Sequence, residues 1–175
     1  ACGQFATLLD TTSCYAGNST GTSPFNGDTG VATATSLNVP SYVVIDSLGD
    51  LYVSDTLNNC VRKVDTSGNI TTVAGLRVNG GPETCDTSSN LAPDPSQGLL
   101  APTGLAIDRS NTLYIADSLH NCVRSLPSGV VDSYASPALT TVAGTCTFVN
   151  TSSVTPVPDG LAVDSYSNLY ISIVD

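Results

Sequence analysis

Three stretches of the chain align without gaps, and they decide the fold. They read VIDSLGDLYVS at 44–54, AIDRSNTLYIA at 106–116 and AVDSYSNLYIS at 162–172. Each begins with a short apolar run, passes through a polar turn opened by Asp46, Asp108 or Asp164, and ends in a second apolar run. The runs are too short for helices and rich in β-branched residues, so each stretch predicts a β-hairpin. The aspartate can accept hydrogen bonds from the backbone of the turn that it opens.

The repeat continues past the hairpin in two copies. DTLNNCVR at 55–62 matches DSLHNCVR at 117–124, and ITTVAG at 70–75 matches LTTVAG at 139–144. Each complete unit therefore has four predicted strands, named A to D in chain order. A single unit of this size cannot bury both of its apolar faces, so the units are expected to stack on one another.

This four-strand unit resembles the NHL repeat, whose copies form the blades of β-propellers. The pattern V-x-D-x-x-G-x-L-Y-V-x-D, followed by N-x-x-V-R-K-V and T-T-V-A-G, carries the resemblance, and FNGDTG at 25–30 resembles the long inter-blade loop of extracellular NHL proteins. The resemblance implies an all-β fold of four-stranded antiparallel propeller blades. Cys60 and Cys122 depart from it, because the family commonly has a basic residue there. Ile173 stands where Asp55 and Asp117 stand in the other copies, which puts the last B–C turn in doubt.

The chain is expected to hold about three blade equivalents. The same spacing separates Cys2 from Gly17 and Cys60 from Gly75, so the N-terminal residues are expected to form strands C and D of a half-blade. The predicted units are a C–D half-blade at 1–17, a blade with a long leading loop at 18–75, a second such blade at 76–144, and an A–B half-blade at 145–175.

Three blades are too few for an ordinary propeller ring, which closes with about four to eight. An unpaired half-blade would also expose a sheet edge. Three completions stay open: two chains form a six-bladed ring, chains join head to tail in a filament, or the sequence is one segment of a longer repeating polypeptide. A filament or longer array is favoured, so the expected partners are copies of the chain itself, head to tail or as a dimer.

The charge balance excludes two classes of partner. Fifteen acidic residues face five basic ones, for a net charge of −10, which argues against nucleic acid and against docking on anionic membranes. No apolar run approaches the roughly 20 residues of a membrane span. Because the acidic residues are scattered, we expect them to favour solubility rather than to bind cations.

Cysteines and glycosylation motifs indicate a secreted, extracellular or cell-surface protein. Six cysteines allow 15 pairings. Repeat symmetry alone favours Cys2–Cys14, Cys60–Cys85 and Cys122–Cys146. Three N-x-S/T motifs, at Asn18, Asn69 and Asn150, predict N-linked glycans.

The chain lacks a recognisable catalytic set, and we expect no enzyme activity. His120 is the only histidine, no C-x-x-C is present, and His120 is expected to be a solvent-exposed turn residue. Some NHL-type propellers are metal-dependent lyases, but these use several clustered histidines. Arg62 and Arg124 are expected to pair with nearby aspartates. The recurrent aspartates are expected to fix turns; a calcium site is the less favoured alternative. They are Asp46, Asp108, Asp164, Asp55 and Asp117.

The sequence thus predicts a non-catalytic extracellular structural glycoprotein. It would be a subunit or repeating segment of a filament or surface assembly, joined by blade completion between subunits. The alternative is an extracellular propeller module that binds a protein or glycan ligand. No cofactor is expected other than covalent glycans.

Overall fold

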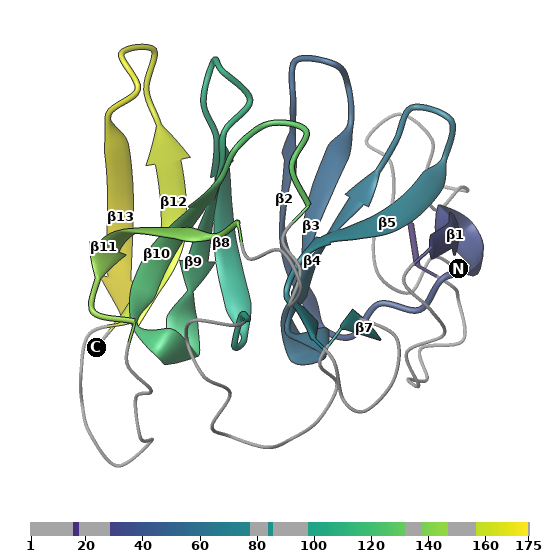
Figure 1. Ribbon diagram of the computed structural model, residues 1–175, viewed down its shortest axis with the longest axis horizontal. Coiled ribbons are helices and arrows are strands. Elements are labelled where there is room, and N and C mark those ends of the chain that lie inside the picture. The colour runs from purple at the N-terminus through teal and green to yellow at the C-terminus, as the bar shows by residue number, and fades with distance from the viewer. Residues whose placement is uncertain are drawn as a thin grey trace.

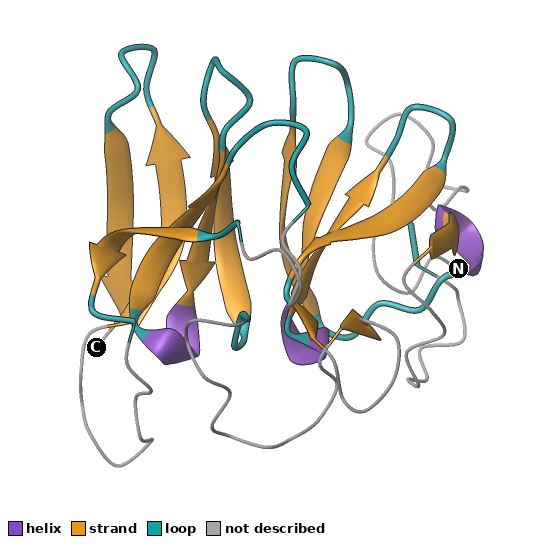
Figure 2. Ribbon diagram, in the orientation of Figure 1, coloured by secondary structure: helices purple, strands orange, loops and turns teal. Residues whose placement is uncertain are grey.

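The structure is a computed structural model that describes residues 16–17, 29–77, 84–85, 98–131, 138–146 and 157–174. These residues form antiparallel β-sheets, three 3-10 turns and no α-helix, so the predicted all-β fold is confirmed. Figure 1 shows three sheets standing side by side, and Figure 2 shows their hairpin loops at one end and two of the 3-10 turns at the other.

The first sheet has five strands in the order β1-β5-β4-β3-β2. Its strands are β1 (Thr29–Val31), β2 (Pro40–Ile45), β3 (Leu51–Asp55), β4 (Cys60–Val64) and β5 (Asn69–Ala74). The 3-10 turns η1 (Ala32–Ala34) and η2 (Thr56–Asn58) follow β1 and β3. Strands β2 to β5 correspond to the predicted strands A to D, and β1 adds an edge strand that the sequence analysis did not foresee.

The second sheet repeats the A to D pattern in the order β11-β10-β9-β8. Its elements are β8 (Pro102–Ile107), β9 (Leu113–Asp117), η3 (Ser118–His120), β10 (Cys122–Leu126) and β11 (Thr140–Gly144). The third sheet contains β12 (Val157–Val163) and β13 (Leu169–Val174), and a small pair joins β6 (Leu76–Arg77) to β7 (Thr84–Cys85). The three larger sheets lie within the units expected at 18–75, 76–144 and 145–175, whose boundaries stay predictions. Of the half-blade expected at 1–17, only Ala16 and Gly17 are described.

The hydrophobic core lies in layers between the sheets. Side chains alternate between the two faces of a strand, so neighbouring residues enter different layers. In β3, Tyr52 packs toward the second sheet, whereas Val53 packs on the opposite face with Ile70 and Leu37. Strand β8, which is strand A (the inner strand) of the second sheet, packs against both β2 and β12. Because a central sheet is covered on both faces, its strands can be apolar at successive positions, as the sequence pattern indicated.

One glycine position closes strand D in both complete blades. Gly75 and Gly144 have φ angles of +88° and +81°, which L-residues rarely adopt. A Cβ on Gly75 would collide with the carbonyl oxygen of Asn59 and lie 2.8 Å from the Cα of Cys60. Gly17 has a φ of +87°, consistent with the same role. The last residue of the T-T-V-A-G motif is therefore required both for its φ angle and for its close contact with the start of strand C.

Gly75→Ala is expected to destabilise the chain by more than Gly68→Ala. Gly68 also has a positive φ, +82°, but a Cβ there would meet nothing within 4 Å. The control variant should therefore lose only about 1–2 kcal/mol of stability, the cost of a left-handed backbone conformation for an L-residue. Gly75→Ala should lose about 1–3 kcal/mol more, since a small-to-large change in a packed site forces the backbone to move. Chemical denaturation measures both, and equal losses would contradict the close-contact argument.

Candidate functional site

The A–B turns are held by the same carboxylate contacts in all three sheets. Asp46 accepts hydrogen bonds from the backbone N–H groups of Leu48 and Asp50, both at 2.9 Å, and from the Tyr52 hydroxyl at 3.3 Å. Asp108 and Asp164 accept the equivalent bonds, including those from Tyr114 and Tyr170. Each carboxylate is thus occupied by at least three donors of its own hairpin, and Asp164 also accepts from Asn168 Nδ2. This is the arrangement of a turn-fixing residue.

In these turns the tyrosine hydroxyls have raised pKa values and the Asp164 carboxylate has a lowered one, as their contacts require. Burial, with a smaller contribution from the Asp46 carboxylate, raises the pKa of Tyr52. The Asp164 carboxylate raises the pKa of Tyr170, which donates to it. The side chain and backbone of Asn168 lower the pKa of Asp164, so this carboxylate stays ionised and available as an acceptor.

A second aspartate lies buried at each B–C corner. Asp55 ends β3 and accepts hydrogen bonds from the Asn38 backbone at 2.6 Å and from Asn58 Nδ2 at 2.9 Å. Its Oδ2 lies 3.4 Å from an Arg62 guanidinium nitrogen, and both side chains are fully buried. Arg62 lies opposite Val53 in the β3–β4 register, so Asp55 is its diagonal neighbour on the same face. Burial raises the pKa of Asp55, against the opposing effect of these donors.

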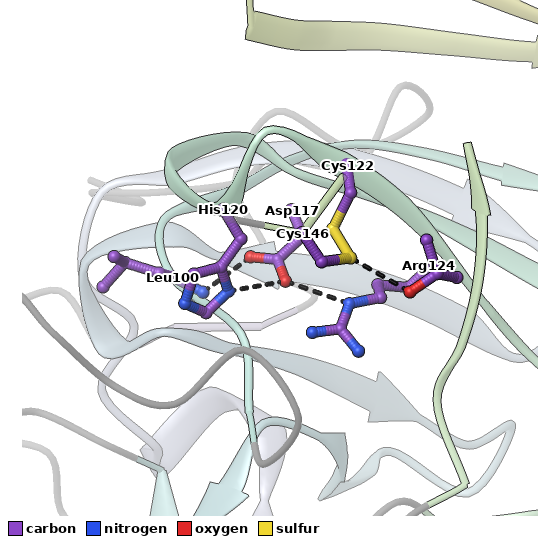
Figure 3. The surroundings of a disulfide bond; sticks show 7 residues. Leu100, Asp117, His120, Cys122, Arg124 and Cys146 are labelled. Atoms are coloured by element: carbon purple, nitrogen blue, oxygen red, sulfur yellow. Dashed lines mark hydrogen bonds and ion pairs between the residues drawn. A yellow bond between two sulfur atoms is a disulfide. The ribbon is translucent and has the colours of Figure 1, made fainter. Parts of the chain in front are cut away.

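The corner of the second sheet contains a histidine. Asp117 accepts from the Leu100 backbone at 2.8 Å, contacts His120 Nδ1 at 2.8 Å and accepts from Arg124 Nε at 3.3 Å (Figure 3). The expectation that His120 is exposed is wrong, because its side chain is fully buried. The 3-10 turn brings the third residue after the aspartate back onto the carboxylate, where Asn58 lies in the first sheet. A His–Asp pair is part of a hydrolytic triad, but a fully buried imidazole cannot reach a substrate.

The structure joins two pairs of cysteines. Cys60 bonds to Cys85 with a Cα–Cα distance of 5.6 Å, and Cys122 bonds to Cys146 with a distance of 4.9 Å. These are the pairs that repeat symmetry favours. Each bond links the first residue of strand C to the segment after strand D, beside the buried aspartate (Figure 3). The third predicted pair, Cys2–Cys14, lies outside the described residues.

Hydroxyl groups connect each blade to the next. Thr56 Oγ1 donates to the Pro102 carbonyl at 2.8 Å, and Ser118 Oγ donates to the Pro158 carbonyl at 2.7 Å. Asn59 Oδ1 also accepts from the Ala101 backbone at 2.8 Å. The sequence analysis missed Thr56 and Ser118, although both carry a hydroxyl directly after the corner aspartate. The B–C corner of one blade therefore positions the inner strand of the following blade.

Comparison with known proteins places these repeats in a family. The family model described as the teneurin NHL domain matches residues 13–171. The chain belongs to this family. It is 37% identical over 94 residues to teneurin-1 of Gallus gallus, an alignment that spans 53% of this chain and 3% of that protein. The predicted NHL relationship is thus confirmed, and the chain corresponds to a small part of this curated relative.

Two solved structures align with the chain at low sequence identity. A protein of unknown function from Bacteroides thetaiotaomicron aligns with a TM-score of 0.52 and 19% identity, over 79% of this chain and 34% of that one. Virginiamycin B lyase from Staphylococcus aureus aligns with a TM-score of 0.47 and 13% identity, over 77% of this chain and 34% of that one. The likeness to the Bacteroides thetaiotaomicron protein concerns the fold alone.

Equivalent side chains on the face of each NHL blade that points toward the following blade differ in exposure. Tyr52 is 9% exposed in the first blade, whereas its counterpart Tyr170 in the third is 56% exposed. In strand D, Val73 is 5% exposed and its counterpart Val142 is 45% exposed. Tyr52 and Val73 are therefore covered where the second blade follows the first, and Tyr170 is open where no further blade follows among the described residues. Val142 is open although the third sheet, with two described strands, follows its blade.

The structure describes one of the three predicted glycosylation sites. Asn69 lies exposed at the start of β5, whereas Asn18 and Asn150 lie outside the described residues. Among the residues that the structure describes, no three His, Cys, Asp or Glu side chains gather as a metal site would require. Within the same residues, no helix has the length and apolar character needed to cross a bilayer.

Asp55→Ala is expected to destabilise the NHL module by about 3–5 kcal/mol, because it leaves the buried Arg62 guanidinium without its carboxylate. Asp159→Ala, at an exposed position of β12, is the control and should change stability by no more than about 0.5 kcal/mol. Adding Arg62→Met to Asp55→Ala should restore part of the loss, since the buried charge is then also removed. Denaturant unfolding measures all three. Equal effects of the two single variants would contradict a buried ion pair.

Proposed function

We propose that this NHL module is a non-catalytic, extracellular building block whose blades continue into a filament or surface assembly of like blades. The observation that carries the proposal is the exposure of Tyr170, at 56%, where Tyr52 is buried by the following blade. Both rings lie on the face that points away from the N-terminal side of the stack. A following blade on the third sheet would cover Tyr170 as the second sheet covers Tyr52.

The opposite end of the stack presents a complementary open face. Val43 and Ile45 of β2 are 39% and 66% exposed, whereas Leu105, the counterpart of Val43, is fully buried against the first blade. The described residues Ala16 and Gly17 begin to cover this face. Ala16 is buried with Leu37 and Val53, and the Gly17 N–H donates to the Ala32 carbonyl. These contacts support the view that a preceding blade ends its strand D here.

The proposed contact with another blade lies at the free edge of the third sheet, beside β13. Strands β3 and β9 pair on both edges, whereas β13 pairs only with β12 among the described residues. Beside it, Val123, Ala143, Pro158, Ile171 and Ile173 line a mainly apolar groove of about 230 Å³. We infer that strand C of another blade of the same type pairs with β13 and covers this groove. Edge pairing supplies backbone hydrogen bonds, and the groove supplies apolar burial.

Location and chemistry agree with a structural role. The disulfide bonds and the teneurin relative both support an extracellular location. The aspartates that recur in the repeats are occupied by turn and corner donors, and His120 is buried, which supports a module without catalysis or a resident cofactor. The proposal includes covalent glycans at the N-x-S/T motifs.

A recognition role is the second candidate. A groove of about 250 Å³ runs across the three A–B turns and combines apolar and polar lining. Its apolar residues are Ile45, Ile107 and Val163, and its polar residues include Ser47, Asp108, Arg109, Asn111 and Asp164. Polar groups that converge along one end of a blade stack are suited to a protein or glycan ligand. This role would apply to the same extracellular module, and a discrete particle that does not grow with concentration would favour it.

Ile173→Glu is expected to weaken self-assembly at least about tenfold, because it places a charge where an apolar groove must close. Leu48→Glu is the matched control, since Leu48 is 69% exposed at a hairpin tip away from the blade faces. Sedimentation velocity over a range of concentrations measures both. A wild-type protein that stays monomeric at its native concentration would overturn the assembly proposal, as would equal effects of the two variants.

A further inference from the structure

A cavity of about 300 Å³ lies between the first and second blades. Tyr52, Lys63 and Thr71 line it from the first blade. The second blade contributes the 127–131 loop, which runs from Pro127 to Val131 after β10. Figure 1 shows this loop arching from the second sheet toward the first. The 127–131 loop thus forms part of the second blade's wall of the cavity.

The wall of this cavity combines open apolar side chains with polar groups. Val130 and Val131 are 39% and 49% exposed, although they lie beside an inter-blade space. Lys63, Asp65 and Asn111 line the same space. Sugars match such a wall, because a sugar ring has apolar C–H faces and hydroxyl groups around its edge. A volume of about 300 Å³ is at the lower end of small-molecule pockets.

One residue of a glycosylation motif lines this cavity. Asn69, Ile70 and Thr71 form an N-x-T sequence at the start of β5. Side chains alternate along the strand, so Asn69 and Thr71 are exposed on one face while Ile70 is fully buried on the other. Thr71 itself lines the cavity. Asn69 therefore faces the same side of the sheet as the cavity.

The attachment atom is held in place by a cavity residue. Asn69 Nδ2 lies 3.3 Å from Asp65 Oδ2, and the Asn69 backbone N–H donates to Asp65 Oδ1 at 2.9 Å. Glycosylation replaces only one of the two hydrogens on Nδ2, so the other can still donate to Asp65. The same donors, the Asn69 backbone first, lower the pKa of Asp65 and keep it ionised. The contact with Asp65 thereby favours one orientation of the Asn69 amide, and with it one direction of an attached sugar.

We propose that Asn69 carries an N-linked glycan whose first sugar lies in this cavity and covers Val130 and Val131. In the modification, Nδ2 attacks the anomeric carbon of a lipid-linked oligosaccharide, loses one proton and releases the lipid diphosphate. Because the sugar is tethered beside the cavity, its high effective concentration lets a weak contact suffice. The inference rests on the extracellular location within the proposed function but not on blade stacking.

The first test uses two substitutions of Thr71 in the whole chain, secreted from eukaryotic cells. Thr71→Ser keeps the glycosylation motif and Thr71→Ala removes it, so glycopeptide mass spectrometry should find the glycan on Asn69 only in the first variant and the wild type. Amide hydrogen exchange at Val130 and Val131 should then be about tenfold slower in Thr71→Ser than in Thr71→Ala, equivalent to about 1.4 kcal/mol. An unmodified Asn69 in the wild type, or equal exchange in the two variants, overturns the proposal.

The second test keeps the glycan and changes the loop. Release of the Asn69 glycan by a peptide N-glycosidase under native conditions should be about tenfold faster in a Val130→Ser, Val131→Ser double variant than in the wild type. Val39→Ser is the control, because Val39 is 58% exposed and does not line the cavity. Equal release rates in the double variant and the wild type would overturn the proposal. Neither readout depends on self-association, so failure of blade stacking would leave both intact.

Discussion

Each blade of this chain is a sheet with two apolar faces, and the rest of the structure depends on covering both of them. The second sheet is covered on both faces, since its inner strand β8 packs between β2 and β12. The first and third sheets are each covered by another full sheet on one side only among the described residues. A repeat with this property is stable only next to its own kind. The fold and the proposed assembly would therefore follow from one constraint.

Polar groups make the stacking specific rather than merely apolar. The buried corner aspartates fix where strand B ends, and Thr56 and Ser118 then donate to the inner strand of the following blade. A buried carboxylate that met no donors would be strongly destabilising, so the corner forms only when its arginine and backbone partners are all in place. The third sheet has Ile173 at this position, and β13 extends through it to Val174. In the third sheet, strand B thus continues through the position at which the other two B strands end.

Much of this architecture could be predicted from the sequence because it repeats. The three hairpins, their turn aspartates and the four-strand unit follow from short periodic patterns, and the joined cysteines Cys60–Cys85 and Cys122–Cys146 occupy equivalent repeat positions. His120 was misplaced because a polar turn suggests solvent, whereas the Leu100 segment that leads into the second sheet and strand β12 of the third sheet both contact this corner. The aligned Asn58, which contacts Asp55, is the signal that could have corrected this. The 127–131 loop could not be placed, since a long insertion contains no repeat to fix its direction.

Electron microscopy of the native material at its native concentration tests most directly whether the open blade faces are completed by like blades. The account predicts continuous filaments or arrays in which blades follow one another at a constant spacing, with density for a strand paired to β13. Discrete six-bladed rings would keep the stacking principle but contradict the filament. Isolated three-sheet particles with Tyr170 open to solvent would contradict the central claim, because the apolar faces would then need no partner.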